Sequence, residues 1–138
     1  MYKSYHSARS KTISEAAAIS SIRLNVICLL YTSFDQAMIN LERHYKFLES
    51  PEPVQQLWIK NSDKLLAYQK GQLLFVFNFH PSYEQELQLQ FPEKPELIFD
   101  SDDQKFGGFG PRSSFGWSKG HLNLILEPRT AMVFRIKE

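Results

Sequence analysis

The chain has 138 residues, 43% of them hydrophobic and 14% aromatic, which is enough for one domain with a sizeable buried core. Sixteen basic and 15 acidic residues leave a net charge of +1, so nucleic acid or another polyanion is not expected as a partner. The single cysteine, Cys28, excludes an internal disulfide bond and fits a reducing compartment, for which we expect the cytoplasm.

Met1–Ser33 is rich in Ser, Ala and basic residues at first and irregularly apolar later. Its longest uncharged stretch, Leu24–Phe34, is well short of the roughly 20 apolar residues that cross a bilayer, so no membrane partner is expected. We interpret the segment as foreign or disordered sequence joined to the rest of the chain, with a divergent N-terminal extension as the alternative. Its removal should leave the remaining fold intact.

Phe34–Leu48 is predicted to be an amphipathic helix. Ser33 is placed to cap its first turn, Asp35 suits the N-terminal end of the helix dipole, and Pro51 follows its last turn. Residues at steps of three and four form one apolar stripe, which consists of Phe34, Met38, Leu41, Tyr45 and Leu48. Because such a stripe is costly to leave in water, it needs a partner, and we expect self-association through this face.

The apolar and aromatic run Leu73–Phe79 is predicted to be the central strand of a sheet. Lys70-Gly71 before it is typical of a tight hairpin turn to the strand Lys64–Gln69, and Val54–Lys60 is predicted to be the strand before that. One face of the central strand carries Phe75, Phe77 and Phe79, and the other carries Leu74, Val76 and Asn78. Since both faces are mostly apolar, both should be covered, and Phe77→Ala is expected to unfold the domain.

The rest of the chain alternates short strands with turns. Glu86–Phe91 and His121–Leu126 alternate apolar and polar residues, and Leu97–Phe99 and Arg129–Ile136 are further predicted strands. Gln104–Gly120 is glycine-rich, which favours a long ordered loop. That loop carries four large aromatic residues, Phe106, Phe109, Phe115 and Trp117. Together these elements predict a mainly β fold, a small antiparallel β-sandwich preceded by one amphipathic helix.

Asp100, Asp102 and Asp103 form the densest acidic cluster, and three interpretations compete. A calcium loop suits clustered carboxylates, but an EF-hand-like count from Asp100 places Lys105 where glycine is needed and Pro111 where glutamate is needed. A glycosidase acid and nucleophile need two carboxylates about 5 Å apart in a cleft, which adjacent acids on one loop do not make unaided. We favour a turn in which the Asp side chains accept hydrogen bonds from nearby backbone amides and hold the following loop.

Other residue types that carry chemistry are scattered, and no cofactor or metal is expected. No cysteine lies at ligand spacing from the four histidines, His6, His44, His80 and His121. Ser113 and Ser114 lack the context of a nucleophile elbow. Tyr83, Trp58 and Trp117 are candidates for stacking on sugar rings, although partial burial in the sandwich is the interpretation that we favour for each.

Four stretches carry a resemblance to a known family. LLFVFNFHPS at residues 73–82 and FDSDDQKFGGFG at residues 99–110 resemble the C-terminal all-β domain of 1,4-α-glucan branching enzymes, which belong to the α-amylase superfamily. FDQAMINLERHYKFL at residues 34–48 resembles the last segment before that domain. EPRTAMV at residues 127–133 resembles its final strand, with Glu127 where serine is more usual. The resemblance covers residues 34–138, about three quarters of the chain.

The resemblance implies three parts, which are an unmatched segment at residues 1–33, a helix from the end of a catalytic barrel at residues 34–50, and the sandwich at residues 51–138. The whole enzymes transfer an α-1,4-linked glucan segment to a glucose 6-hydroxyl, which makes an α-1,6 branch, by a retaining mechanism with two carboxyl groups on the barrel. None of those catalytic residues is recognised in this chain. The chain alone is therefore expected to be an inactive accessory domain of glycogen or starch synthesis, with the barrel as its partner.

Six residues are expected on the surface that faces the barrel or a glucan, namely Asp100, Asp102, Asp103, Phe106, Phe109 and Trp117. An α-glucan, either glycogen or starch, is the second expected partner. Two other functions stay open. Exposed coplanar aromatic rings would favour a free-standing glucan-binding module, and a bare hydrophobic patch on one side of the sandwich would favour a purely structural domain that stabilises the barrel.

Overall fold

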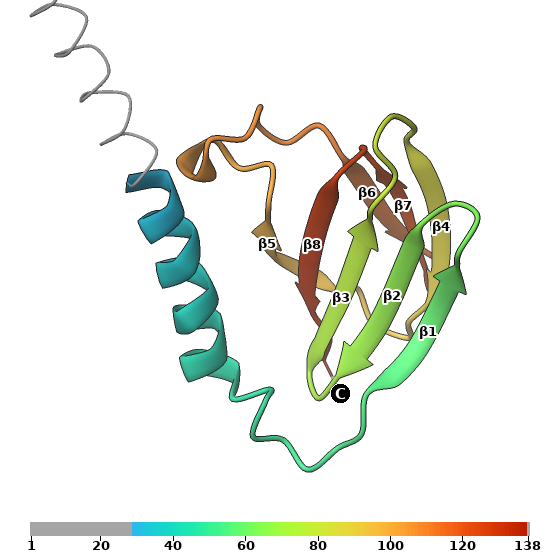
Figure 1. The fold of residues 1–138 in the computed structure, drawn as a ribbon. Coiled ribbons are helices and arrows are strands. Elements are labelled where there is room, and N and C mark those ends of the chain that lie inside the picture. Colours follow the sequence, from blue (N-terminus) through green and yellow to red (C-terminus); the bar gives the residue numbers. More distant parts are fainter. Residues whose placement is uncertain (1–28, 138) are drawn as a thin grey trace, which may run out of the picture.

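The computed structural model describes residues 29–137, which form one helix, residues 29–45, and two antiparallel sheets packed face to face (Figure 1). The strands in chain order are β1 (Gln55–Lys60), β2 (Leu65–Lys70), β3 (Leu73–Asn78), β4 (Gln85–Gln90), β5 (Glu96–Asp100), β6 (Ser114–Ser118), β7 (His121–Leu126) and β8 (Thr130–Arg135). One sheet has the order β1-β2-β3-β8-β5 and the other the order β4-β7-β6. The predicted helix followed by a small antiparallel β-sandwich is therefore confirmed.

β3 lies in the middle of the five-stranded sheet, and its residues 73–76 are covered on both faces, as predicted. The outer face is less covered further along, since Phe77 is half-buried and Phe79 is 58% exposed. β3 pairs with β2 on one side and with β8 on the other. The turn into it passes through Gly71, whose φ of +54° is a conformation that glycine adopts more readily than other residues. Leu73, Leu74, Phe75 and Val76 are all buried, because the three-stranded sheet covers one face and the helix with its flanking residues covers the other.

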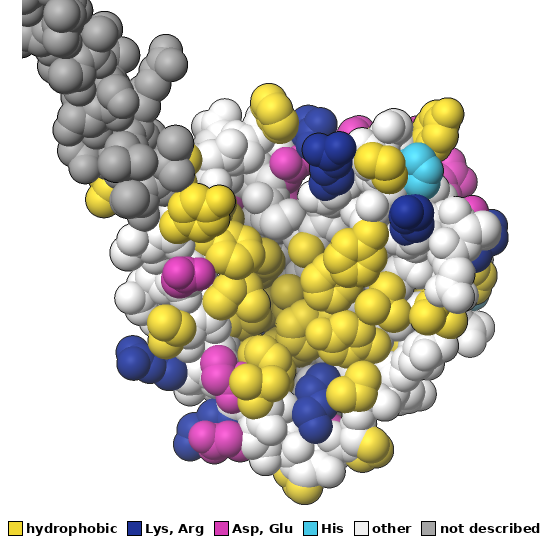
Figure 2. Space-filling model, viewed as in Figure 1, with side chains coloured by type: hydrophobic (Ala, Val, Ile, Leu, Met, Phe, Trp, Pro, Cys, Tyr) yellow, Lys and Arg dark blue, Asp and Glu magenta, His cyan; other side chains and the backbone are white. Residues whose placement is uncertain are grey.

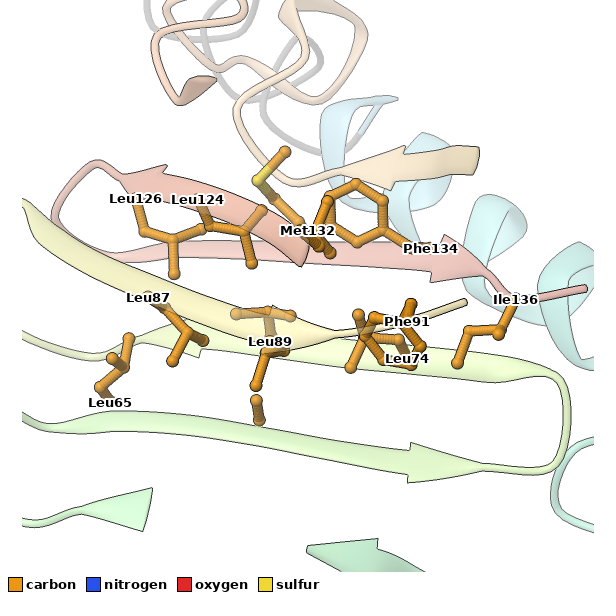
Figure 3. Close-up of a cluster of buried hydrophobic side chains, with 13 residues drawn as sticks. Leu65, Leu74, Leu87, Leu89, Phe91, Leu124, Leu126, Met132, Phe134 and Ile136 are labelled. Atoms are coloured by element: carbon orange, nitrogen blue, oxygen red, sulfur yellow. The ribbon is translucent and has the colours of Figure 1, made fainter. Parts of the chain in front are cut away.

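The main core lies between the two sheets, and alternate residues of facing strands fill it (Figure 3). Phe134 on β8 is wholly buried there, and β4 and β7 direct every second side chain inward, which confirms their predicted alternation. The inward residues of these two strands are Leu87, Leu89, Leu122, Leu124 and Leu126. Their burial and that of their partners supply most of the hydrophobic stabilisation of the fold.

Asn78, which interrupts the apolar run of β3, joins the two sheets. Its Nδ2 donates to the carbonyl oxygens of Tyr83, Leu126 and Glu127 at 3.1, 3.0 and 3.1 Å, and its Oδ1 accepts the amide of His80 at 3.0 Å. A buried amide is stable only when such partners satisfy it. The polar interruption of the run is therefore a fixed link between the end of β3 and the end of β7.

The outer face of the five-stranded sheet carries a second hydrophobic cluster, which combines residues of the helix with residues of β3, β5 and β8. The ring of Phe34 lies 5.6 Å from that of Phe99, centroid to centroid, and Leu41 is buried. Met38 and Tyr45 also pack against this cluster, whereas Leu48 is 71% exposed. The apolar stripe of the helix, apart from Leu48, therefore finds its partner within the chain.

Two details of the predicted helix are wrong. The helix already includes residues 29–33, so Ser33 is not its N-cap but a helical residue whose hydroxyl donates to the carbonyl oxygen of Leu29 at 2.9 Å. The helix also ends at residue 45, before Leu48, because Lys46 takes a φ of +48° and the Glu42 carboxylate accepts the amide of Leu48 at 3.2 Å. Side-chain capping ends the helix before Pro51 is reached.

The prediction of one loop over Gln104–Gly120 is wrong in its second half, which contains β6. This edge strand pairs with β7 and places Phe115 opposite Leu124 and Trp117 opposite Leu122. It contains one glycine and two serines, which obscure its strand character in the sequence. The period-two spacing of its two aromatic residues was the signal that could have revealed it.

The interpretation of residues 1–28 as foreign sequence lies outside the described residues. Residues 29–33, which belong to the same predicted segment, are part of the helix, and a Cβ built on Gly107 would lie 2.9 Å from Leu30 Cδ1. The boundary predicted at Phe34 therefore does not separate these residues from the domain. Within residues 29–137, no helix combines the length and the apolar character that crossing a bilayer requires.

Candidate interdomain surface

The acidic cluster at the end of β5 forms a hydrogen-bonded turn. Asp100 Oδ1 accepts the amide of Asp102 at 2.9 Å, and Asp103 Oδ1 accepts the amide of Lys105 at 3.0 Å. Asp103 thereby caps a short 3-10 helix, Gln104–Phe106. No group of three potential metal ligands occurs within the described residues. The geometry is that of the turn expected from the sequence, with the carboxylates holding backbone amides.

Asp102 is the buried member of the cluster, and an arginine neutralises it. Arg112 Nε donates to Asp102 Oδ2 at 2.8 Å, and its Nη1 lies 3.8 Å from Glu127 Oε2. The hydrogen bond to Asp102 is also the main reason that the pKa of Arg112 is raised. This arrangement ties the loop after β5 to the segment before β8.

The two flanking carboxyl groups respond in opposite directions to their surroundings. Burial raises the pKa of Asp100, and the nearby charges of Asp102 and Asp103 act in the same direction. Hydrogen bonds from the backbone and side chain of Lys105 lower the pKa of Asp103. A raised and a lowered carboxyl pKa side by side are what an acid and nucleophile pair would require, but here both carboxylates are bound to the turn itself.

The backbone of this loop folds tightly on itself. A Cβ built on Gly108 would lie 2.1 Å from the carbonyl oxygen of Asp102, so only glycine fits at that position. The amide of Gly110 donates to the same oxygen at 2.8 Å. Gly107 has a φ of +82° and ends the 3-10 helix. The loop is therefore a rigid structure with its glycines at the points of closest approach.

The structure separates the three aromatic residues predicted for the surface. Phe106 is half-buried between the helix and β5, with its ring 5.5 Å from Phe34 and 5.4 Å from Phe99. Phe109 is 80% exposed, and the guanidinium of Arg112 lies 4.9 Å from its ring centre. Trp117 lies in the other sheet, where its Nε1 donates to the carbonyl oxygen of Phe91 at 3.0 Å. The three Asp residues, Phe106 and Phe109 thus share one loop, whereas Trp117 does not.

Sequence reasoning did not find the main feature of the outer face, which is a row of stacked aromatic rings across β2 and β3. Tyr68 stacks on Phe75 at 4.9 Å and on Phe77 at 6.0 Å, and Phe77 stacks on Phe79 at 5.3 Å with 3° between the ring planes. We call these four residues the aromatic row. The period-two spacing of the three Phe residues was visible in the sequence, but the position of Tyr68 opposite Phe75 depends on the hairpin register.

Figure 2 shows hydrophobic side chains that cover the middle of this face, beside the helix and over β3 and β2. Phe75 is buried, with the ring of Phe47 from the turn after the helix 5.2 Å away, while Tyr68 and Phe77 are half-buried. Further from the helix, Phe79 is 58% exposed and Ile59 on β1 is 54% exposed. Apolar patches of this kind on a domain surface are typical of contact with another protein element.

The aromatic row offers one exposed ring for stacking on a sugar. Phe79 is 58% exposed, whereas Phe75 is buried and Tyr68 and Phe77 are half-buried. Among the other candidates, Tyr83 packs against the ring of His80 at 4.7 Å, and Trp58 lies in β1, 42% exposed. Among the ring pairs in close contact within residues 29–137, none joins two exposed aromatic residues.

The remaining polar candidates have structural contacts. His80 Nδ1 accepts the amides of Ser82 and Tyr83 at 3.1 and 2.9 Å, which orders the turn after β3. Ser113 Oγ accepts the amide of Glu127 at 3.0 Å. These contacts fix loops at one end of the sandwich.

The fold and this surface define an antiparallel β-sandwich domain with a helix packed on one half of the outer face of its larger sheet. Residues 58–137 match the family described as alpha amylase, C-terminal all-beta domain, and the chain belongs to that family. The relatives extend the match. A 1,4-alpha-glucan-branching enzyme of Oryza sativa subsp. japonica is 37% identical over 123 residues, which cover 74% of this chain and 15% of that enzyme.

Two further relatives carry the same enzyme name. The 1,4-alpha-glucan-branching enzyme 2-2 of Arabidopsis thaliana is 39% identical over 80 residues, which cover 55% of this chain and 10% of that enzyme. That of Emericella nidulans is 28% identical over 118 residues, which cover 76% of this chain and 17% of that enzyme. The chain thus spans less than a fifth of the length of each of these relatives.

Proposed function

We propose that this chain is the C-terminal accessory domain of a 1,4-alpha-glucan-branching enzyme, together with the helix that precedes it. The observation that carries the proposal is the extent of the match. The family match begins at residue 58, whereas the similarity to the rice enzyme covers 74% of the chain and so reaches upstream toward the helix. A helix and a sandwich that are shared with the same enzymes and packed on each other are one structural unit of that parent.

The partner of this unit is the catalytic barrel, which would carry out the transfer of an α-1,4-glucan segment to a glucose 6-hydroxyl. The support is the uncovered half of the outer face, because a bare hydrophobic patch on one side of the sandwich is what a barrel-stabilising domain requires. The domain would contribute stability to the barrel, and the barrel would contribute the catalytic carboxyl groups. A division into the helix, which spans residues 29–45 in the structure and not the predicted 34–50, and the sandwich at residues 51–138 fits this proposal, with the helix as the junction.

Direct glucan binding has less support, because Phe79 is the only exposed ring of the aromatic row and Trp117 is half-buried. Self-association through the helix stripe also has less support, since the stripe packs on the sheet of its own chain. The cytoplasm stays our proposed compartment, on the single cysteine of the chain. Two of the plant relatives have "chloroplastic/amyloplastic" in their names, so a plastid is the alternative that localisation of a fluorescent fusion would detect.

The test is a replacement chimera. The segment of the full-length rice enzyme that aligns with this chain is replaced by this chain, and branching of amylose is followed by the loss of iodine-stained absorbance. We expect the chimera to branch amylose, while the isolated chain does not. A chimera without activity, or activity of the isolated chain, would overturn the proposal.

A further inference from the structure

The outer face of the five-stranded sheet is wider than the helix that covers it. Neighbouring strands lie about 4.8 Å apart, so the axes of β1 and β5 are separated by about 19 Å. One helix with side chains is about 10 Å across, and covers about two strands. The helix of residues 29–45 lies at the β5 side of this sheet, where Phe34 meets Phe99, and away from β2 and β1, which it leaves without a cover (Figure 1).

We infer that a second amphipathic helix, supplied by the rest of the parent enzyme, packs beside helix 29–45 on the aromatic row and on Ile59. The inference rests on the proposed function and names the surface and the kind of element that join this domain to the barrel. The part of the outer face over β2 and β1, which we call the uncovered strip, has about the width of one helix. It continues the hydrophobic cluster under helix 29–45, since Phe75 belongs both to that cluster and to the aromatic row. Two helices side by side at 8–10 Å are ordinary helix packing.

A second copy of this chain fits the strip poorly. Its only α-helix in the described residues would have to enter with its outward face, and that face is mostly polar. Ile39 on it is apolar and 46% exposed, but the other exposed residues include Asp35, Gln36, Asn40, Arg43 and His44. These side chains would be buried against Phe79 and Ile59 without partners, which costs free energy. More than four fifths of each relative's length lies outside the match and is the source of an amphipathic helix that we propose.

The edge of the uncovered strip at the end of the β1–β2 hairpin indicates one polar contact with the docked helix. A hollow of about 410 Å³ at the end of the β1–β2 hairpin is lined by Ile59, Lys64, Leu66 and Phe79 among others. Lys60, which also lines the hollow, is paired with Asp63, whereas Lys64 has no ion pair with any residue in 29–137. The docked helix should therefore carry an acidic side chain where it passes Lys64, next to the apolar side chain that fills the hollow.

The test compares one thiol in two settings. Ile59→Cys is made in the isolated chain and in the rice chimera, both with Cys28→Ser, and its maleimide labelling rate is read at that peptide by mass spectrometry. Ile125→Cys is the matched control, because Ile125 is 40% exposed on the outer face of the other sheet. We expect at least tenfold slower labelling of position 59 in the chimera than in the isolated chain, and equal rates at position 125.

The segment that covers position 59 is identified by photo-crosslinking, with a benzophenone maleimide attached to the cysteine at position 59 of the chimera. Capture of one rice-enzyme segment at residues spaced three and four apart supports a helix. Capture of an extended segment, or equal labelling of position 59 in both settings in a chimera that branches amylose, overturns the inference and leaves the proposed function standing. If position 59 labels slowly in the isolated chain and that chain has the mass of a dimer, a second copy occupies the uncovered strip. This outcome also overturns the inference. An inactive chimera removes the proposed function and the inference together.

Discussion

The buried carboxylate of Asp102 accepts a hydrogen bond from Arg112 Nε at 2.8 Å, and this contact closes the loop that carries Phe106 and Phe109. Phe106 in turn packs on Phe34 of the helix. The charge pair lies outside the apolar cluster, yet it sets the position of the aromatic ring that fastens the helix to the sheet. The acidic cluster is therefore part of the structure that holds the helix on the sheet.

Asp102→Ala should lower the free energy of unfolding by about 1–3 kcal/mol, because it removes a charged acceptor and leaves the guanidinium of Arg112 without its main partner. Arg112 is partly exposed and can turn to solvent, so the lower part of this range is expected. Urea denaturation gives the measurement. Glu93→Gln, at an exposed carboxylate, is the control and should change the midpoint little. Equal midpoints for Asp102→Ala and wild type would show that the pair does not hold the loop.

Gly108→Ala should destabilise the fold by about 1–3 kcal/mol or more, since the added methyl group would lie 2.1 Å from the carbonyl oxygen of Asp102, a backbone atom that cannot move aside alone. Gly116→Ala is the matched control, because a Cβ there meets nothing within 4 Å and glycine is unfavourable inside a strand. Thermal unfolding by circular dichroism should show a lower Tm for the first variant and an unchanged or higher Tm for the second. The reverse order would contradict the described loop.

The sandwich could be predicted from the sequence because the order of apolar and polar residues in its strands indicates which side chains are buried. Leu87 and Leu89 alternate with polar residues and point into the core, and the unbroken run from Leu73 is buried on both faces. β6 escaped prediction because two serines and Gly116 dilute its pattern and only Trp117 is half-buried. The C-terminal end of the helix was predicted wrongly because Lys46 adopts a positive φ and Glu42 caps the end. Hydrophobic periodicity indicates neither feature.

The candidate surface was less predictable, because it depends on pairs that are distant in sequence. The turn formed by Asp100 and Asp103 is local, and the sequence was sufficient to expect it. The stacking of Tyr68 on Phe75 follows from the register of a hairpin, and the bond from Arg112 to Asp102 follows from the path of a loop. Neither contact can be predicted from the periodicity of the residues around it.

Phe134→Ala should cost about 3–5 kcal/mol, since this ring is wholly buried between the sheets. Phe77→Ala, which the sequence alone predicts to unfold the domain, should cost less, because Phe77 lies half-buried in the aromatic row on the outer face. Guanidinium denaturation of both variants tests the order of the two effects. A larger loss for Phe77→Ala would mean that the outer face contributes more to the stability of the isolated chain than its exposure indicates.

Asp100→Asn should stabilise the domain at neutral pH and leave it unchanged in acid. The pKa of Asp100 is raised in the folded state, chiefly by burial, so the folded state binds a proton at this position more tightly than the unfolded state does. The ionisation of Asp100 therefore does not change the free energy of unfolding below the ordinary carboxyl pKa of about 3.9. It lowers the free energy of unfolding as the pH rises from there through the raised pKa of Asp100. The asparagine Oδ1 can still accept the amide of Asp102, so the variant removes the charge and keeps the turn. The difference in Tm between variant and wild type should be near zero at pH 3 and positive at pH 7. A difference that is constant with pH, or negative at pH 7, would show that the charge of Asp100 is not the cause.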